Sequence, residues 1–136
     1  MVERWDLIYR GGVAFGGAAT VYLFGGWSAL LGVLLSFVIV DYLTGLGAAW
    51  VNGELNSDIG RRGIVKKVCI FLMVGVGHLI DVALQTEIII MTATVFFYLS
   101  IEALSIIENV GRIGLPVPQK LKDAIAVLNG KSEAQK

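Results

Sequence analysis

The chain has 136 residues, of which 56% are hydrophobic and only 16% are charged, and its acidic and basic residues balance to a net charge of zero. About a quarter of the residues in an average soluble domain are charged, so this composition excludes an ordinary soluble domain and is typical of a membrane protein. A neutral chain has no overall field to attract nucleic acid, and we expect no nucleic-acid partner. A single cysteine, Cys69, excludes an internal disulfide and a metal site built from several cysteines.

No charged residue occurs between Gly11 and Val40. One straight helix over those 30 residues would be about 45 Å long, whereas the hydrocarbon core of a bilayer is about 30 Å thick. We therefore predict two helices, at about 7–24 and 28–51, separated by a tight turn at Gly25-Gly26-Trp27. The alternative is a single tilted helix and three spans in total. The run does not end in a signal-peptide cleavage site, so we expect no cleaved signal peptide.

Two further apolar runs follow, at about 64–84 and 88–107. A polar loop at about 52–62 leads into the first of them, and the short turn Gln85-Thr86-Glu87 separates the two. Short connections make neighbouring helices antiparallel, so each pair forms a hairpin. We predict an all-α membrane protein in which residues 1–112 form about four transmembrane helices, arranged as two hairpins.

Basic residues gather in and beside the loop at 52–62. Loops rich in Lys and Arg face the cytoplasm, and with four spans both termini then face the cytoplasm as well. Several further basic residues follow the last apolar run and agree with this orientation. The residues that mark the cytoplasmic side are Arg61, Arg62, Lys66 and Lys67.

The segment 113–136, after the last span, is predicted to form a cytoplasmic amphipathic helix and a tail. Pro116 and Pro118 cannot continue the preceding helix, and proline is favoured in the first turn of a new one. Apolar side chains then recur at helical spacing, with lysines on the opposite side, at Leu121, Ala124, Ile125 and Leu128. We expect this helix to lie on the inner membrane surface or to pack on the central loop as a partly frayed helix, and residues 131–136 to be disordered.

Polar side chains inside the apolar runs form stripes along single helix faces. An acidic residue near the centre of a spanning helix costs about 2.5–3.5 kcal/mol on insertion scales, so each such residue should face protein or water. Residues three and four apart share a helix face. The second helix carries Asp41, Thr44 and Asn52 in this way, the fourth carries Thr94, Tyr98, Glu102, Ser105 and Asn109, and the third carries His78, Asp81 and Gln85.

Two interpretations of these stripes stay open. They line an aqueous surface or a helix contact that opens in an oligomer, or each carboxylate is satisfied within one chain by a hydroxyl or a neighbouring basic residue. At the rise of an α-helix, Asp41 and Glu102 both lie roughly 20 Å from the outer face, which places them at similar levels in the cytoplasmic half. Asp81 falls near the outer surface, where an interfacial position explains it, and His78 is spaced to pair with it.

Small residues spaced by four are a further feature of the apolar runs, and they occur as Gly12 with Gly16 and Gly45 with Ala49. Such pairs allow membrane helices to approach closely, so they indicate helix association without naming a partner. The chain has one histidine, one cysteine, no phosphate-binding glycine loop and no cluster of metal-ligand residues. We therefore expect neither an enzyme nor a cofactor.

Several blocks of the sequence occur in an order and spacing that is specific to one family. The first block runs from Asp41-Tyr42-Leu43-Thr44-Gly45 through Asn52-Gly53-Glu54-Leu55-Asn56-Ser57 to Gly63-Ile64-Val65-Lys66-Lys67. The others are Asp81, the stretch from Glu102 to Asn109, and Gly114-Leu115-Pro116-Val117-Pro118. With these blocks the chain resembles the toxin-secretion and phage-lysis holin family, from about Gly25 to Leu128.

The resemblance implies a small phage or prophage protein of the bacterial cytoplasmic membrane. Holins accumulate in the bilayer, form homo-oligomers, and at a set time open lesions that release an endolysin to the cell wall, while some relatives export toxins. The residues by themselves fit two other functions. One is a small ion channel or proton-coupled transporter in which Asp41, Asp81 and Glu102 form a relay, and the other is a non-conducting scaffold whose partner binds the basic loop or the C-terminal helix.

Overall fold

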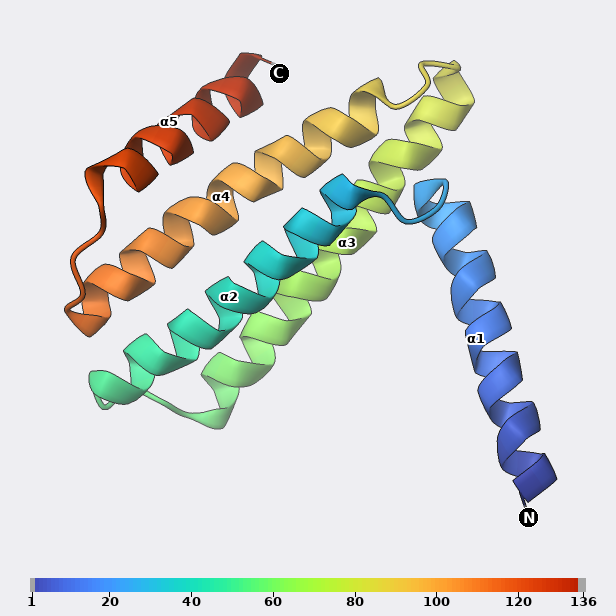
Figure 1. Cartoon of the computed structure of the whole chain (residues 1–136), viewed down its shortest axis with the longest axis horizontal. Coiled ribbons are helices and arrows are strands. Elements are labelled where there is room, and N and C mark those ends of the chain that lie inside the picture. Colours follow the sequence, from blue (N-terminus) through green and yellow to red (C-terminus); the bar gives the residue numbers. More distant parts are fainter. Residues whose placement is uncertain (1, 135–136) are drawn as a thin grey trace.

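A computed structural model describes residues 2–134, and in that range every regular element is an α-helix. The five helices are α1 (Val2–Phe24), α2 (Ala29–Val51), α3 (Ser57–Leu84), α4 (Ile89–Ile113) and α5 (Gln119–Ala134) (Figure 1). Helices α1 to α4 are each long and apolar enough to cross a membrane. The predicted all-α fold with four candidate spans is therefore confirmed.

The break between α1 and α2 lies at the predicted glycine pair. Gly25 and Gly26 both have left-handed backbone angles, with φ of 70° and 115°, which glycine adopts without steric cost. The hydroxyl of Ser28 then accepts a hydrogen bond from the backbone N–H of Leu31 at 3.2 Å and caps α2. The long uncharged run is thus two helices rather than one tilted helix.

Helix α3 begins at Ser57, earlier than the predicted start near residue 64. The side chain of Asn56 accepts a hydrogen bond from the N–H of Ile59 at 2.9 Å, and Asp58 lies in the first turn, where a carboxylate is favoured by the helix dipole. The polar loop is therefore shorter than predicted. All four of the basic residues assigned to the cytoplasmic side lie on the first turns of α3.

Helix α4 extends to Ile113, beyond the predicted end near residue 107, and the chain then turns back on itself. Gly114 caps α4 in a left-handed conformation with φ of 100°, and its N–H donates to the carbonyl of Val110 at 3.2 Å. Helix α5 runs back alongside α4 (Figure 1). Its partner is thus α4 and not the central loop. The expected disorder from Lys131 on is wrong as far as Ala134, and residues 135–136 lie outside the described residues.

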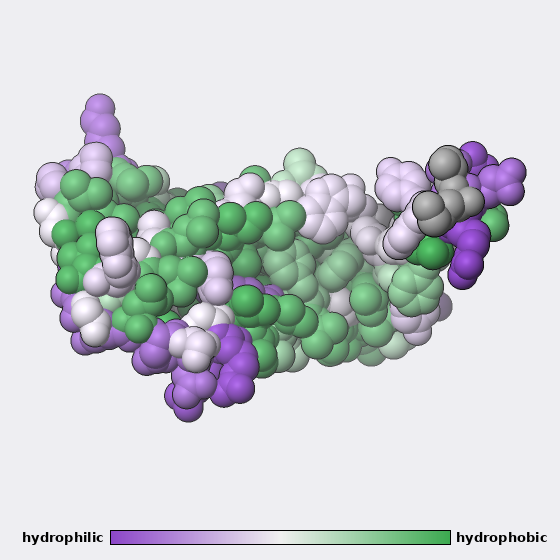
Figure 2. All heavy atoms as spheres, turned by 90° about the horizontal axis from the view of Figure 1, so that it is seen from below, coloured by the Kyte–Doolittle hydropathy of each residue, from purple (hydrophilic) through white to green (hydrophobic). Residues whose placement is uncertain are grey.

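Helices α2, α3 and α4 form the core of the molecule. Buried apolar side chains from all three make one cluster, formed by Leu31, Leu34, Val38, Ile70, Val74, Met91, Val95 and Leu99. Helix α2 packs mainly on α4, and α3 also packs against α4. Seen from below, apolar side chains cover much of this face, and hydrophilic ones gather at its two ends and along part of the lower edge (Figure 2).

Helix α1 diverges from this core (Figure 1). Among the described residues it contacts α3 alone, through its last turn, where Phe24 meets Phe71 edge to face at 6.3 Å between ring centroids. A Cβ at Gly12 or Gly16 would have no neighbour from another part of the described chain within 4 Å. The packing role predicted for these two glycines stays a prediction, because α1 is unpartnered along most of its length.

Candidate functional site: a buried charge cluster

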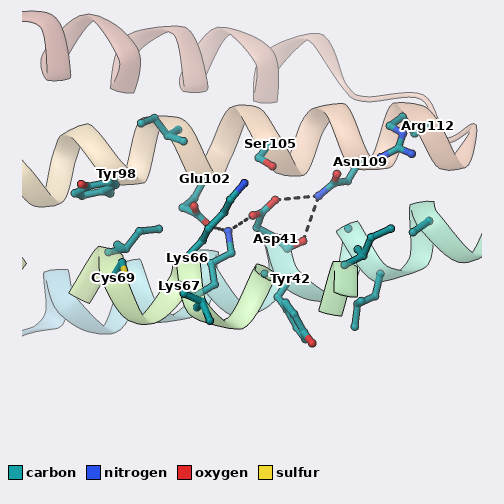
Figure 3. A pocket seen from close by; sticks show the side chains of 18 of the residues that line it. Asp41, Tyr42, Lys66, Lys67, Cys69, Tyr98, Glu102, Ser105, Asn109 and Arg112 are labelled. Atoms are coloured by element: carbon teal, nitrogen blue, oxygen red, sulfur yellow. Dashed lines mark hydrogen bonds and ion pairs between the residues drawn. The ribbon is translucent and has the colours of Figure 1, made fainter. Parts of the chain in front are cut away.

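The ammonium of Lys67 on α3 lies between two carboxylates, Asp41 on α2 and Glu102 on α4 (Figure 3). Its Nζ donates to Glu102 Oε2 at 2.6 Å and also to Asp41 Oδ2. The exposed fractions of the three side chains are 17% for Lys67, 8% for Asp41 and 3% for Glu102. We call these three residues the charge cluster. It joins three helices at one level, so Asp41 and Glu102 lie level with each other as predicted, while their depth in a membrane stays a prediction.

Asn109 on α4 completes the hydrogen bonding of Asp41. Its side-chain Nδ2 donates to Asp41 Oδ1 at 2.9 Å, to the backbone oxygen of Asp41 at 3.2 Å and to Thr44 Oγ1 at 3.1 Å. A Cβ at Gly45 would lie only 3.5 Å from Asn109 Nδ2, and Ala49 is buried one turn further along α2. The small residue Gly45 thus leaves room for the side chain of Asn109 on α4. Within the monomer, a basic residue and an amide satisfy both carboxylates.

A groove of about 640 Å³ opens between α2, α3 and α4 beside the charge cluster. Its wall on α4 contains Tyr98, Glu102, Ser105 and Asn109, so this part of the predicted polar stripe shares one face. The side chain of Thr94 lies elsewhere. It donates to the carbonyl of Ile90 at 2.8 Å within its own helix. The pore-lining role predicted for the stripe stays a prediction.

Asn52 lies at the end of α2, away from the charge cluster. It is the C-cap residue of that helix, and its side-chain amide donates to the carbonyl of Ala48 at 2.8 Å. Its predicted neighbours on the stripe, Asp41 and Thr44, are the ones that the structure brings to Asn109. The α2 stripe therefore divides into a part that meets α4 and a part that ends the helix.

Asp81, near the other end of α3, caps the neighbouring helix. Its carboxylate accepts hydrogen bonds from the backbone N–H groups of Ile90 at 2.9 Å and Met91 at 2.7 Å, and from the hydroxyl of Thr86 at 2.5 Å. The side chain is fully buried. Its partners are the first N–H groups of α4, which have no acceptor within their own helix. Asp81 therefore has a structural role as the cap of α4, and its predicted depth near the outer surface stays a prediction.

His78 packs against the turn between α1 and α2. A Cβ at Gly25 would come within 2.9 Å of its ring atom Cε1, so the absence of a side chain there makes room for the imidazole. Its Nδ1 is buried and has no hydrogen-bond partner in the described part of the chain. Within the described residues no hydrogen bond joins His78 to Asp81, whose carboxylate accepts from the start of α4 instead.

The basic residues assigned to the cytoplasmic side divide into two groups. Arg61, Arg62 and Lys66 are exposed, and Arg61 pairs with Asp58 at 2.7 Å. Lys67 instead points between α2 and α4. Its assignment to the membrane surface is therefore corrected, and it is the site residue that sequence reasoning missed.

A spacing signal in α3 could have identified Lys67. Counting back from Asp81 in steps of four and three gives Gly77, Val74, Ile70 and Lys67, all on one helix face. Gly77, Val74 and Ile70 are buried against the other core helices. A lysine in register with that buried stripe, and level with two carboxylates on neighbouring helices, indicates an internal ion pair.

Comparison with known proteins gives the chain its family. A model of the bacteriophage holin family matches residues 18–130. The chain belongs to this family. A relative named as a probable holin, from Bacillus phage phi105, is 36% identical over 115 residues, which cover 85% of this chain and 84% of that protein. An uncharacterised protein of Halalkalibacterium halodurans is 50% identical over 118 residues, covering 83% and 87%. One from Listeria innocua is 41% identical over 127 residues, covering 93% and 91%. No solved structure matches the chain.

The matched region of this holin-family protein contains both buried carboxylate sites and reaches almost to the end of α5. It begins inside α1, so the first turns of that helix lie outside it. The charge cluster and the Asp81 cap are thus features of the part that places the chain among holins.

Proposed function

We propose that this holin-family protein oligomerises in the cytoplasmic membrane of a bacterium and opens lesions that release an endolysin, or in some settings a toxin, without itself being an enzyme. The observation that carries the proposal is the match to the bacteriophage holin family over residues 18–130. Four helices of spanning length support association with a lipid bilayer. No direct binding of the endolysin is implied, since a lesion in the membrane is enough to let it reach the wall.

We infer the orientation from charge. Arg61, Arg62 and Lys66 are exposed on the first turns of α3, and Arg112 lies in the last turn of α4. Helices α2, α3 and α4 alternate in direction, so these residues mark one end of the bundle. The positive-inside rule assigns that end to the cytoplasm, and four spans then place both termini there.

The charge cluster supports a mechanism in which assembly exposes polar groups that one chain keeps closed. In the single chain Lys67 neutralises one of two carboxylates, and little of the cluster is exposed. Helix α1 is unpartnered along most of its length, so it offers an apolar surface for association. In the lesion, rearranged helices would turn Asp41 and Glu102, with the groove beside them, toward water.

The test is expression in a bacterium with and without a cytoplasmic muralytic enzyme. The expected result is an abrupt collapse of membrane potential, followed by lysis when the enzyme is present. Growth with an intact potential would refute the proposal and favour a scaffold. Leakage of solutes of graded size distinguishes a lesion from the remaining alternative. A channel or transporter built on Asp41 and Glu102 passes ions and small solutes but releases no protein.

The mechanism has its own test in the timing of lysis. Asp41→Asn and Glu102→Gln each remove a charge from the cluster while keeping the side-chain shape, so we expect each to shift the moment of potential collapse or abolish it. The matched control is Glu54→Gln, an exposed acid whose partner is Arg112, and its timing should stay that of the unaltered protein. If both cluster variants also keep that timing, the cluster has no part in triggering, although the family assignment stands.

A further inference from the structure

Helix α1 carries an arginine inside a segment that is long and apolar enough to cross a membrane. Arg10 is exposed, and within the described residues it forms no ion pair. It precedes Phe24, the last residue of α1, by 14 residues, which is about 21 Å of helix. Asp41 follows Ser28, the cap of α2, by 13 residues, or about 20 Å. Measured along the helices from the turn that joins α1 to α2, Arg10 and the charge cluster are therefore equally far away.

The groove beside the charge cluster presents charges in a definite order. Lys67 neutralises only one of the two carboxylates of the cluster, and all three residues line the groove. Lys66 also lines it (Figure 3), one residue further from the α1–α2 turn, and is exposed without an ion-pair partner in the described part of the chain. Further along, Arg112 and Glu54 pair with each other. Leading away from the turn, the groove thus has an excess negative charge and then a free positive one.

One face of α1 has the opposite order. Glu3, Asp6 and Arg10 share this face at spacings of three and four, and they border one small hollow on the helix. Leading away from the turn, the positive charge comes first and the negative charges follow. Toward the turn the same face continues with the small residues Ala14 and Gly17. The groove is also mainly apolar in that direction, where it is lined by Ile70, Met73 and Ile101.

The α1 that fits this groove is that of a second copy of the chain. Within one chain α1 meets α3 through its last turn, where Phe24 packs on Phe71. At 3.6 residues per turn, Phe71 lies about 100° around α3 from Ile70 in the groove. The chain's own α1 therefore leaves from a different side of α3 and diverges from the core (Figure 1). Copies inserted the same way into one membrane have their α1–α2 turns on the same side, so a neighbour presents Arg10 at the level of the cluster.

We propose that α1 of one copy docks in the groove of a second copy, where its Arg10 binds the carboxylates of Asp41 and Glu102 and its Asp6 faces Lys66. The inference rests on the proposed function, which supplies the assembly in the membrane, and it names the two surfaces that join the copies. The contact belongs to the closed assembly, before the lesion turns the groove toward water. Because the two surfaces are different parts of the chain, a head-to-tail series of such contacts builds large assemblies.

Crosslinking between two differently tagged copies tests the contact. One copy carries Ala14→Cys in a Cys69→Ser background, and the other is the unaltered chain, whose Cys69 lines the groove. A short membrane-permeant bismaleimide is added to cells that express both, before the potential collapses, and the dimer that carries both tags is measured. The matched control is Gly12→Cys, at a position where a Cβ meets open space. We expect about tenfold more mixed dimer from residue 14, because residues 12 and 14 point to nearly opposite sides of the helix.

Three results of this experiment would overturn the inference. They are equal yields from the two positions, no mixed dimer from either, and dimers confined to copies with the α1 thiol, which indicate that two α1 helices pair with each other. The membrane potential is followed in the same cells. Collapse of the potential without the mixed dimer refutes this contact and leaves the proposed lesion standing. The mixed dimer without any collapse supports the contact and refutes the lesion.

The charge of Arg10 has a test of its own in the same assay. Adding Arg10→Gln to the Ala14 variant should lower the yield of mixed dimer by about tenfold or more, the size expected for a hydrogen bond between charged groups. The matched control is Arg4→Gln, which removes the same charge from another side of α1 and should leave the yield unchanged. If the two substitutions have the same effect, Arg10 makes no specific contact with the cluster, and the inference is wrong.

Discussion

Replacing Lys67 by methionine tests whether the charge cluster holds α2, α3 and α4 together. The substitution keeps an unbranched apolar chain as far as Cε and removes the ammonium that binds Asp41 and Glu102. With 8% and 3% of these carboxylate side chains exposed, solvent screens them little, so the values for a buried pair apply rather than those for a surface pair. Breaking a buried pair costs about 3–5 kcal/mol, which is roughly a 100- to 4,000-fold change in the folding equilibrium.

The assay is unfolding of the purified protein from mild detergent by titration with a denaturing detergent, followed by tryptophan fluorescence. Lys66→Met is the matched control, because it removes the same charge from the exposed neighbouring position. Adding Asp41→Asn and Glu102→Gln to the Lys67 variant should recover most of the loss, since an uncharged cluster leaves no buried charge without a partner. The reasoning is refuted if the Lys67 and Lys66 variants unfold at the same detergent concentration.

Three further predictions use the same titration. Asp81→Ala removes the acceptor for the first N–H groups of α4 and should lower stability by about 2 kcal/mol, so unaltered unfolding would contradict the capping role. Gly77→Ala places a Cβ 3.2 Å from the Cα of Met91 and should lower the free energy of unfolding by about 1–3 kcal/mol. Gly12→Ala meets open space and should raise it by up to about 1 kcal/mol. If the Gly12 variant were the less stable of the two, the packing described for Gly77 would be contradicted. Arg112→Ala breaks an exposed ion pair with Glu54 and should cost at most about 1 kcal/mol, and a larger loss would mean that this pair is screened less than its exposure indicates.

The sequence predicts the helices of this protein well because hydrophobic length and glycine breaks decide them locally. The turn at Gly25-Gly26 and the start of α2 at Ser28 need only local backbone and capping preferences. The apolar run alone predicts too late a start for α3, near Ile64, whereas the helix begins at Ser57. The capping residue Asn56 and the acidic Asp58 in the first turn were the better guide.

The partners of the polar residues are harder to predict, because they depend on how the helices rotate and pack. The level shared by Asp41 and Glu102 follows from helix rise alone. That Lys67 binds both depends on how α3 packs against the α2–α4 pair, which no local pattern in α2 or α4 determines. Asp81 shows the same limit, since its acceptor role depends on where the next helix begins.

The Asp81 cap has a consequence for how the protein enters the membrane. The N-cap residue of α4, Ile88, makes no side-chain cap hydrogen bond, so the helix depends on a carboxylate that belongs to the preceding helix. During synthesis Asp81 emerges before its partners Ile90 and Met91, so α3 alone would carry an unpaired charge into the bilayer. Completing α4 supplies the missing donors. Helices α3 and α4 are therefore suited to insert together as one unit, with the cap formed as the second helix arrives.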